Sequence, residues 1–293
     1  MFQHSALIVW TIFILTIVFS KVSGHGRLVE PPSRATMWRF GFKTLPNYDD
    51  NQLFCGGVSI QYGVNGGKCG VCGDPWNSVR DHEAGGKYAT GILVRKYNTG
   101  SVIDVVIELT ANHKGYFQFR LCPNDAPNAT ITQACLDQYL LARTSDGATT
   151  LGVPAGDYSK TMILVYRLQL PKGVKCRACL LQWKYNAGNS WGVFPNGTSC
   201  IGCGDQEQFY GCADIAIGYD DVVLGEFQSY FPYATDSPIN DHTVIQNFDT
   251  DYPNQNCAEV FYGVCISSCP SFSSLSVLAD VILAIGTYLL VVR

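Results

Sequence analysis

The central part of the chain alternates apolar and polar residues with a period of two rather than 3.6. This is the pattern of β-strands that bury one face. The clearest stretch, 102–110, places Ile103, Val105, Ile107 and Leu109 on one side and more polar residues on the other. Further strands are predicted at 116–121, 162–170, 179–185, 213–218 and 258–266.

Segments rich in Gly, Pro, Asn and Asp separate these strands and are predicted to be loops, notably 56–73 and 186–204. Short antiparallel strands joined by long disulfide-bonded loops predict an all-β fold, with an antiparallel β-sandwich of immunoglobulin-like or fibronectin-III-like layout as the leading choice. No internal repeat and no Pro- or Ser-rich linker divides this part. We therefore expect one domain over 25–268.

The first 24 residues have the pattern of a secretory signal peptide, although residues 1–5 lack the usual Lys or Arg. The apolar run 6–19 is short for a membrane span and precedes a small residue, Gly24. Cleavage after Gly24 makes His25 the mature N-terminus, with two adjacent nitrogen ligands, its free α-amine and its imidazole Nδ1. Without that cleavage, His25 is an ordinary loop histidine.

The other end of the chain is also apolar, from 275 to 292, and only Arg293 follows. A spanning helix is normally followed by a basic cytoplasmic cluster, and Asp280 would be costly inside a bilayer. Small residues Ser267 and Ser268, a short spacer and a terminal apolar tail fit a glycosylphosphatidylinositol (GPI) attachment signal over 269–293 better than a transmembrane tail. We expect a secreted protein that is anchored by lipid on the outer face of the plasma membrane.

All 13 cysteines follow the leader, which in a secreted chain indicates disulfides. Loss of Cys269 with the tail would leave an even number of cysteines, all of which could then form disulfides. Three Cys-x-x-Cys pairs, at 69/72, 176/179 and 200/203, are compatible with zinc or redox sites, but secretion favours pairing each cysteine with a distant partner.

Other features of the composition fit a secreted protein. Sequons at Asn128 and Asn196 predict a glycoprotein. A net charge of −4 without any dense Lys/Arg run argues against nucleic acid as a partner, and we expect a monomer.

A second histidine stands where a metal site could form. His113 lies between the strands predicted at 102–110 and 116–121, at a strand end or tight turn. Together with the amine and Nδ1 of His25, the Nε2 of His113 would complete a T-shaped set of three nitrogens, and tetragonal nitrogen coordination favours copper. His82 and His242, each beside acidic residues, are interpreted as solvated surface histidines.

An aromatic residue and a carboxylate are candidates for the surroundings of this metal. Alternation places Glu207, Phe209 and Gly211 on one side of a segment and Gln208 and Tyr210 on the other. If Phe209 faces the metal, its ring covers one axial position, and Glu207 can hydrogen-bond an oxygen species there. Neighbouring Tyr210 keeps this assignment open, and a Phe in a strand is more often a core residue.

Four segments together resemble the lytic polysaccharide monooxygenases, most closely the animal group called auxiliary activity family 15. They are HGRLVEPPSR at 25–34, CGVCGD at 69–74, ANH at 111–113, and the pattern ExFxxCAD at 207–214. They extend over most of the mature chain, and the first is specific when it follows a signal peptide.

The resemblance implies one copper ion held by His25 and His113 in a histidine brace, with Ala111 on one axial side and an aromatic, here aligned with Phe209, on the other. It also implies a flat copper-bearing surface and an insoluble polysaccharide substrate. The implied reaction is oxidative rather than hydrolytic: an external electron donor reduces the copper, hydrogen peroxide or dioxygen is the co-substrate, and hydroxylation of a glycosidic carbon breaks the chain.

Two functions remain open at this stage. The first is a copper-dependent monooxygenase, with chitin favoured because the animal group is associated with it, and cellulose possible. The second is a membrane-anchored copper- or chitin-binding protein of the same fold without turnover. Trp76, Tyr116 and Trp191 are the candidate aromatics for a polysaccharide surface.

Overall fold

The computed structural model describes residues 25–127, 129–156 and 160–226, together with the backbone of three short strands at 243–246, 260–261 and 264–265. The predicted leader and the predicted lipid-attachment signal both lie outside these residues. The chain divides into two compact units, one of residues 1–230 and 236–248, the other of 231–235 and 249–293. No helix within the described residues is long and apolar enough to cross a membrane.

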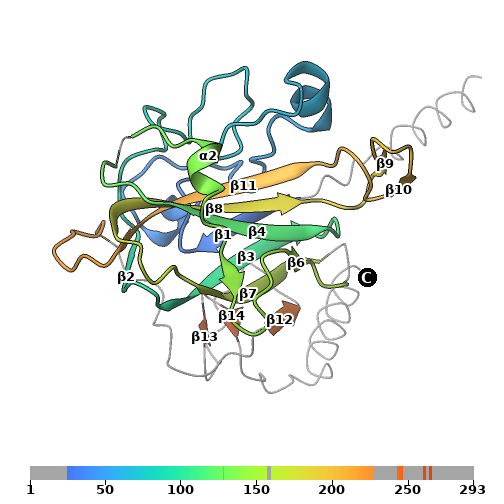
Figure 1. The fold of residues 1–293 in the computed structure, drawn as a ribbon. Helices are drawn as coiled ribbons and strands as arrows, with labels where there is room; N and C mark the ends of the chain where they lie inside the picture. The colour runs from blue at the N-terminus through green and yellow to red at the C-terminus, as the bar shows by residue number, and fades with distance from the viewer. Residues whose placement is uncertain are drawn as a thin grey trace, which may run out of the picture. The chain divides into compact units, whose positions relative to one another are not determined.

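The first sheet of the larger unit has five strands. Its order is β1-β3-β7-β12, and β5 pairs with β7 beside this path. The strands are β1 (His25–Glu30), β3 (Val102–Ala111), β5 (Ala142–Arg143), β7 (Met162–Gln169) and β12 (Thr243–Gln246), all paired antiparallel. The N-terminal strand of the described chain is thus an edge strand of this sheet (Figure 1).

The second sheet also has five strands, in the order β2-β11-β8-β4-β6. These are β2 (Arg95–Tyr97), β4 (Tyr116–Cys122), β6 (Leu151–Gly152), β8 (Cys176–Asn186) and β11 (Gln208–Ile217). Its pairs are antiparallel except for β2 with β11, which is parallel. The two sheets pack face to face, so the predicted all-β sandwich is confirmed.

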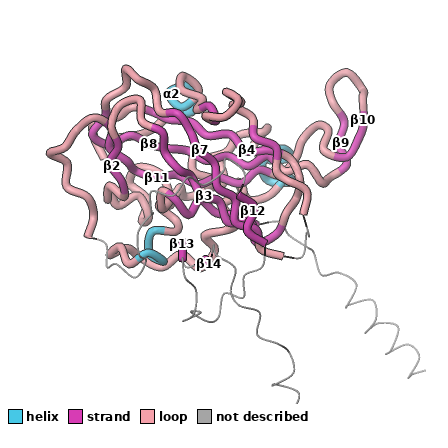
Figure 2. The backbone as a smooth tube through the Cα atoms, turned by 90° about the horizontal axis from the view of Figure 1, so that it is seen from below, coloured by secondary structure: helices cyan, strands magenta, loops and turns pink. Residues whose placement is uncertain are grey.

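Smaller elements lie in the connections. The short helix α2 (Gln133–Leu136) follows β4, a 3-10 helix covers Met37–Phe40, and a π-helical turn covers Ser59–Val64. A two-stranded ribbon of β9 (Trp191–Val193) and β10 (Ser199–Ile201) projects from the sandwich (Figures 1 and 2). In the smaller unit, β13 (Val260–Phe261) pairs with β14 (Val264–Cys265).

The predicted strands are largely confirmed, with differences at their ends. Strands β3, β4 and β7 match the predicted ranges within one residue, whereas β8 and β11 begin three and five residues earlier than expected. The segment 258–266 forms two paired strands rather than one, and a glycine, Gly263, stands between them in the sequence. The two predicted loops are not free of structure, since one contains the π-helical turn and the other the β9–β10 ribbon.

The core between the sheets is rich in aromatic rings that come mainly from the second sheet. Phe117 and Phe119 on β4 pair in register with Tyr185 and Trp183 on β8, and all four side chains are buried. Phe117 meets both Trp183 and Tyr185 edge to face, an arrangement that aromatic pairs prefer. Because successive side chains of a strand point to opposite faces, the residues that alternate with these, such as Gln182 and Lys184 on β8, lie on the other side of the sheet.

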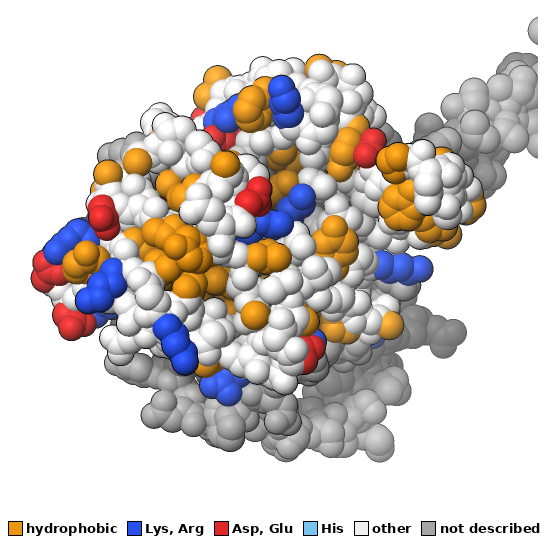
Figure 3. All heavy atoms as spheres, viewed as in Figure 1, with side chains coloured by type: hydrophobic (Ala, Val, Ile, Leu, Met, Phe, Trp, Pro, Cys, Tyr) orange, Lys and Arg blue, Asp and Glu red, His pale blue; other side chains and the backbone are white. Residues whose placement is uncertain are grey.

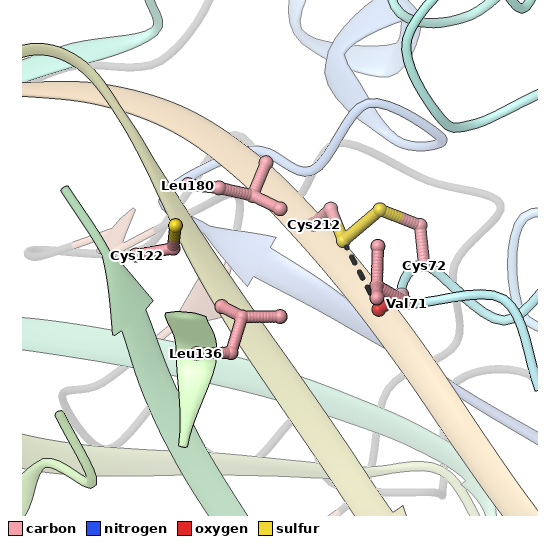
Figure 4. Packing of buried hydrophobic residues seen from close by; sticks show 6 residues of the cluster. All are labelled: Val71, Cys72, Cys122, Leu136, Leu180 and Cys212. Carbon is pink, nitrogen blue, oxygen red and sulfur yellow. Dashed lines mark hydrogen bonds between the residues drawn. A yellow bond between two sulfur atoms is a disulfide. The ribbon is translucent and has the colours of Figure 1, made fainter. Parts of the chain in front are cut away.

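That outer side of the second sheet is covered by loops and carries a smaller hydrophobic cluster (Figure 4). Its buried members are Val71, Cys72, Cys122, Leu136, Leu180 and Cys212. Beside them, the guanidinium of Arg34 donates to both carboxylate oxygens of Asp214 at 2.7 Å and to the carbonyl of His82 at 2.8 Å. This ion pair is buried and ties the segment after β1 to the outer face of β11.

Five disulfides join ten cysteines in the described part of the chain. Two of them connect Cys72 with Cys212 and Cys55 with Cys69, while another joins Cys122 to Cys135. The other two are Cys176–Cys179 and Cys200–Cys203. The expectation of distant partners is therefore wrong for two of the three Cys-x-x-Cys pairs, because those two close on themselves.

The ion pair between Arg34 and Asp214 gives a test of this packing. We expect Arg34→Met to lower the free energy of unfolding by about 3–5 kcal/mol, because it leaves the carboxylate of Asp214 buried without its partner. The double variant Arg34→Met/Asp214→Leu should recover much of the loss. Urea denaturation measures both, and Lys43→Met, which removes the exposed pair of Lys43 with Glu226, is the control and should change little. A single variant as stable as the parent would contradict the assignment.

Candidate metal centre

The first strand places His25 beside the end of β3. In the register of the antiparallel pair, His25 lies opposite Ala111, two residues before His113. The backbone around His25 is held by Asn51 and Thr110: Gly26 N–H donates to Asn51 O at 3.1 Å, and Thr110 Oγ1 donates to His25 O at 3.3 Å. Asn51 Nδ2 in turn donates to Thr110 Oγ1 at 3.2 Å. The strand end that carries His25 is therefore fixed from both sides.

Residue 26 has to be glycine for this strand to lie where it does. A Cβ atom at Gly26 would be 2.6 Å from Cδ2 of Leu109 and 3.1 Å from the ring of Trp183, and both side chains are fully buried. Without a side chain, the backbone of β1 can lie directly against the aromatic core. The same core that stabilises the sandwich thus sets the position of His25.

His113 lies where the chain crosses from the first sheet to the second, between β3 and β4. The crossing is a tight turn in which Lys114 and Gly115 have φ values of 57° and 80°. Asn112 stabilises it, because its Oδ1 accepts from Lys114 N–H at 2.8 Å and its Nδ2 donates to Pro154 O at 3.0 Å. A Cβ at Gly115 would be 2.0 Å from Asn186 O, so the turn is pressed against the end of β8.

The backbone of His113 is hydrogen-bonded on both sides to residues at the end of β8. Its N–H donates to the hydroxyl of Tyr185 at 2.9 Å, and its carbonyl accepts from Gly188 N–H at 2.8 Å. Burial, together with the nearby charge of Glu207, raises the pKa of Tyr185, so its hydroxyl keeps its proton while it accepts from His113. The backbone of His113 is therefore held by a fully buried hydroxyl on one side and by a half-buried backbone N–H on the other.

The imidazole of His113 is buried but not fully hydrogen-bonded. Its Nδ1 has no hydrogen-bond partner, and the nearest charged group is the carboxylate of Glu207, with Oε2 at 3.7 Å. Glu207 directly precedes β11, and its carbonyl accepts from Ala187 N–H at 2.9 Å. A buried ring nitrogen without a hydrogen-bond partner is unusual in a folded protein, and here the only charged group beside it that is described is Glu207.

Phe209 and Tyr210 lie on opposite faces of β11. Phe209 is fully buried, pairs in register with Tyr185 and stacks between that ring, at 5.6 Å, and the ring of Phe54, at 6.1 Å. Tyr210 pairs with Lys184 on the outer face, where its hydroxyl donates to Gln208 Oε1 at 2.8 Å. Of the two aromatics, Phe209 shares its face with the tyrosine that holds His113.

Within the described residues, no three side chains of His, Cys, Asp or Glu gather into a group that could hold a metal ion. At this end of the sandwich, the imidazole of His113 lies beside the carboxylate of Glu207, and the backbone of His25 pairs with Ala111.

Comparison with known proteins decides the family. Residues 25–215 match the family described as "Lytic polysaccharide mono-oxygenase, cellulose-degrading", and the match begins at His25. The chain belongs to the lytic polysaccharide monooxygenases.

A solved structure agrees with this assignment. It is the lytic polysaccharide monooxygenase AA15 from Thermobia domestica in the Cu(I) state, 43% identical, with a TM-score of 0.63 over 66% of this chain and 98% of the other. Among curated proteins, no match was found. The resemblance to the animal group, auxiliary activity family 15, and the monooxygenase class are thereby confirmed.

The structure places His82 of this monooxygenase differently from expectation. The prediction that His82 is solvated is wrong: its Nε2 accepts from Asn47 Nδ2 at 2.9 Å, its Nδ1 lies 2.8 Å from Asp74 Oδ1, and its ring stacks on Tyr88. Acidic neighbours in the sequence suggested that His82 is exposed. They do not determine its burial, because the imidazole of His82 turns inward to Asp74. His242 lies outside the described residues.

The candidate aromatics of the monooxygenase lie on separate elements, two on strands and one in a loop. Trp191 is exposed on the β9–β10 ribbon, Trp76 lies between Arg80 and Lys68 in the loop before β2, and Tyr116 begins β4 opposite Asn186. Ala111 is buried at the end of β3. Of the two sequons, Asn196 is exposed in the turn of the ribbon, and Asn128 lies outside the described residues.

Sequence reasoning missed the residues that hold the two histidines. Gly188 acts through its backbone N–H, and Asn51 acts through its carbonyl and a side-chain hydrogen bond to Thr110, so neither belongs to a pattern that the sequence reveals. Tyr185 acts through its hydroxyl. The sequence feature that could have indicated this role is the presence of a tyrosine at the end of an apolar predicted strand.

Removal of the Tyr185 hydroxyl tests how His113 is held. We expect Tyr185→Phe to lower the free energy of unfolding by about 1–3 kcal/mol, because the buried N–H of His113 loses its acceptor. Chemical denaturation monitored by circular dichroism measures the change. Tyr48→Phe, which alters an exposed ring, is the matched control. Equal stability of the two variants would show that the hydroxyl is not needed there.

Proposed function

We propose that the protein is a copper-dependent monooxygenase that cleaves chitin oxidatively, with one copper ion bound by the amine and imidazole of His25 and by the imidazole of His113. The observation that carries the proposal is the β1–β3 register, which brings residue 25 beside the strand end that leads to His113. Membership of a family that oxidises insoluble polysaccharide with an external reductant supports it, as does the Cu(I) state of the Thermobia domestica relative.

The residues present fit a copper ion. Imidazole nitrogens are good ligands for copper. The Nδ1 of His113 is buried beside the carboxylate of Glu207, and the Nε2 on the other side of the ring is the nitrogen that we assign to the metal. Removal of the leader after Gly24 would free the amine of His25 at the same strand end. The start of the family match at residue 25 supports that cleavage.

The bound copper supplies one-electron redox chemistry, fed by an external electron donor, with hydrogen peroxide or dioxygen as co-substrate. The protein's own groups fix and shape the site around it. Tyr185 and Gly188 hold the backbone of His113, Phe209 fills the space beside Tyr185 with a ring that cannot ligate, and Glu207 offers a carboxylate 3.7 Å from the His113 ring. Glu207 is thereby placed to orient the ring or to accept a proton.

Chitin is proposed as the substrate because the chain belongs to the animal group. The family description names cellulose instead, so the assay has to include both polymers. A binding protein without turnover is the alternative, and it predicts copper binding and polymer binding with no oxidised product.

The ligand set can be tested with two variants that differ in which nitrogen they remove. His113→Ala removes one imidazole, whereas a form with one extra alanine ahead of His25 keeps both imidazoles and converts the amine into an amide. We expect each to weaken copper binding by at least about tenfold and to abolish oxidised oligosaccharides from chitin with ascorbate, because each loses one of three nitrogen ligands.

Calorimetry measures the affinity, electron paramagnetic resonance the nitrogen coordination, and mass spectrometry the products. N-terminal sequencing of the secreted protein checks that it begins at His25. A mature protein that begins elsewhere would refute the proposal, and copper binding with no product from either polymer would favour the alternative function.

We further propose that residues 269–293 direct attachment of a lipid anchor, which places the domain on the outer face of the plasma membrane. The apolar tail behind Ser267 and Ser268 supports this proposal.

Phosphatidylinositol-specific phospholipase C should then release the protein from the surface of cells that express the full chain. A chain that stops at Ser268 should appear in the medium without the enzyme and serves as the control. Full-length protein that stays on the cells after treatment would indicate a transmembrane tail instead.

A further inference from the structure

Two basic side chains are neighbours on the outer face of the second sheet. Strands β4 and β8 pair Arg120 with Gln182 and Gln118 with Lys184, so Arg120 and Lys184 occupy diagonal positions on adjacent strands. Both alternate with the buried aromatic residues of these strands and therefore point away from the core. Long side chains at diagonal positions on one face are within reach of each other, and like charges there repel.

The guanidinium of Arg120 is only partly hydrogen-bonded. Its Nε donates to Asp137 Oδ1 at 2.9 Å, and its Nη2 donates to Gln118 Oε1 at 2.9 Å. Its Nη1 is buried and has no hydrogen-bond partner among the described residues. The carboxylate of Asp137 is also shared, because its Oδ1 accepts from Gln133 Nε2 at 2.9 Å. A buried donor on a charged group is costly to leave without an acceptor, so Nη1 is suited to a ligand.

The ammonium of Lys184 lacks a carboxylate partner in the described part of the chain. Lys184 is half-buried, forms no salt bridge there, and its Nζ lies 5.6 Å from the centre of the Tyr210 ring. Burial first, and then the positive charge of Arg120, lower the pKa of the Lys184 amine to about 8, while Asp137 acts in the opposite direction. A negative charge beside this amine would favour its charged form.

The remaining titratable groups around the pair are phenols and one carboxylate. Burial raises the pKa of Tyr210 on β11, and it also raises the pKa of Tyr62, so both phenols stay neutral. Tyr116 at the start of β4 is a third phenol near them. Asp137 is more than half exposed and is already bonded to Arg120. Among the described residues, two positive charges thus face one negative charge here.

This pair is not part of a broad basic surface. The whole chain has a net charge of −4, and basic side chains are scattered among acidic and uncharged ones on the face that Figure 3 shows. A polyanion needs many cations in a row, whereas two adjacent donors suit a single small anion. A guanidinium and an ammonium bind phosphate, sulfate and carboxylate oxygens through charge-assisted hydrogen bonds.

We propose that Arg120 and Lys184 form a binding site for a small oxyanion, either an inorganic one such as phosphate or sulfate or the carboxylate of an acidic sugar. The oxyanion accepts from Nη1 of Arg120 and from the ammonium of Lys184, and its charge offsets their repulsion. This site goes beyond the proposed function, because it requires neither copper nor a neutral polysaccharide.

Labelling of the unaltered, secreted protein with acetic anhydride at pH 8 tests the site without any substitution. Only the free amine reacts, and a bound oxyanion favours the ammonium of Lys184. We therefore expect inorganic phosphate, at constant ionic strength, to slow the labelling of Lys184 about threefold or more. Peptide mass spectrometry measures each lysine. Lys96, which is exposed and donates to the carbonyl of Asp220, is the internal control and should be labelled at an unchanged rate.

Calorimetry with phosphate, sulfate and glucuronate measures the affinity and distinguishes an inorganic anion from an acidic sugar, with glucose as the neutral control. Arg120→Met and Lys184→Met should each weaken binding at least about tenfold, because each removes one charge-assisted donor. Lys96→Met removes the same charge elsewhere and should bind as the parent does. Arg120→Met should also slow the labelling of Lys184 without any anion, since the charge that lowers its pKa is gone.

The outcomes separate this inference from the proposed function. Protection of Lys184, with binding heats that vanish in both variants, supports the site. Labelling of Lys184 that none of the three anions slows overturns it, even if no variant folds. Equal protection by sodium chloride overturns it as well, because that result shows screening alone. Copper affinity and oxidised products are measured separately, so each proposal can fail without the other.

Discussion

The close contact between β1 and the aromatic core is the constraint on which the rest of the structure depends. Strand β1 can approach Trp183 and Leu109 only because residue 26 has no side chain. The sheet pairing that follows sets the register with β3, and this register decides which residue stands beside the crossing to β4. A slip by one residue would turn every side chain of β1 to the opposite face. Core packing and site geometry are therefore set by one and the same contact.

Strand β8 has a similar double role. Its inner residues Trp183 and Tyr185 form the middle of the core, and the hydroxyl of Tyr185 together with Gly188 fixes the backbone of His113. The turn that carries His113 is thus supported by a buried tyrosine of a central strand of the second sheet and by the residue that follows this strand.

The fold could be predicted from the sequence wherever one face of a strand is buried and the other is not. Strand β3 shows the alternation plainly, whereas the first half of β11 is buried on both sides by the core and by covering loops, so its pattern carries no period of two. Strand β1 is short, contains a glycine and ends at a proline pair, and nothing in its composition favours a strand. Alternation in the sequence indicates that one face of a strand is buried. The positions of β1 and β11 depend instead on segments that are distant in the sequence, and alternation does not reveal these.

Within the site, the two histidines and Phe209 could be named from motifs, but their supports could not. The predictions for His82 and for two of the Cys-x-x-Cys pairs failed for the same reason. In both cases, the partner of the side chain depends on which segment lies nearest in space. Asp74 is eight residues away from His82 in the sequence, and only the folded loop brings them together.

The Cys72–Cys212 bond has a topological consequence. It closes a covalent ring that contains His113, Tyr185 and the β9–β10 ribbon, whereas His25 lies on the chain that enters this ring. A protease that cuts the backbone once at any point between those two cysteines opens the ring but separates nothing. The two pieces stay joined through sulfur, so the nicked molecule would travel as one species until a reductant divides it.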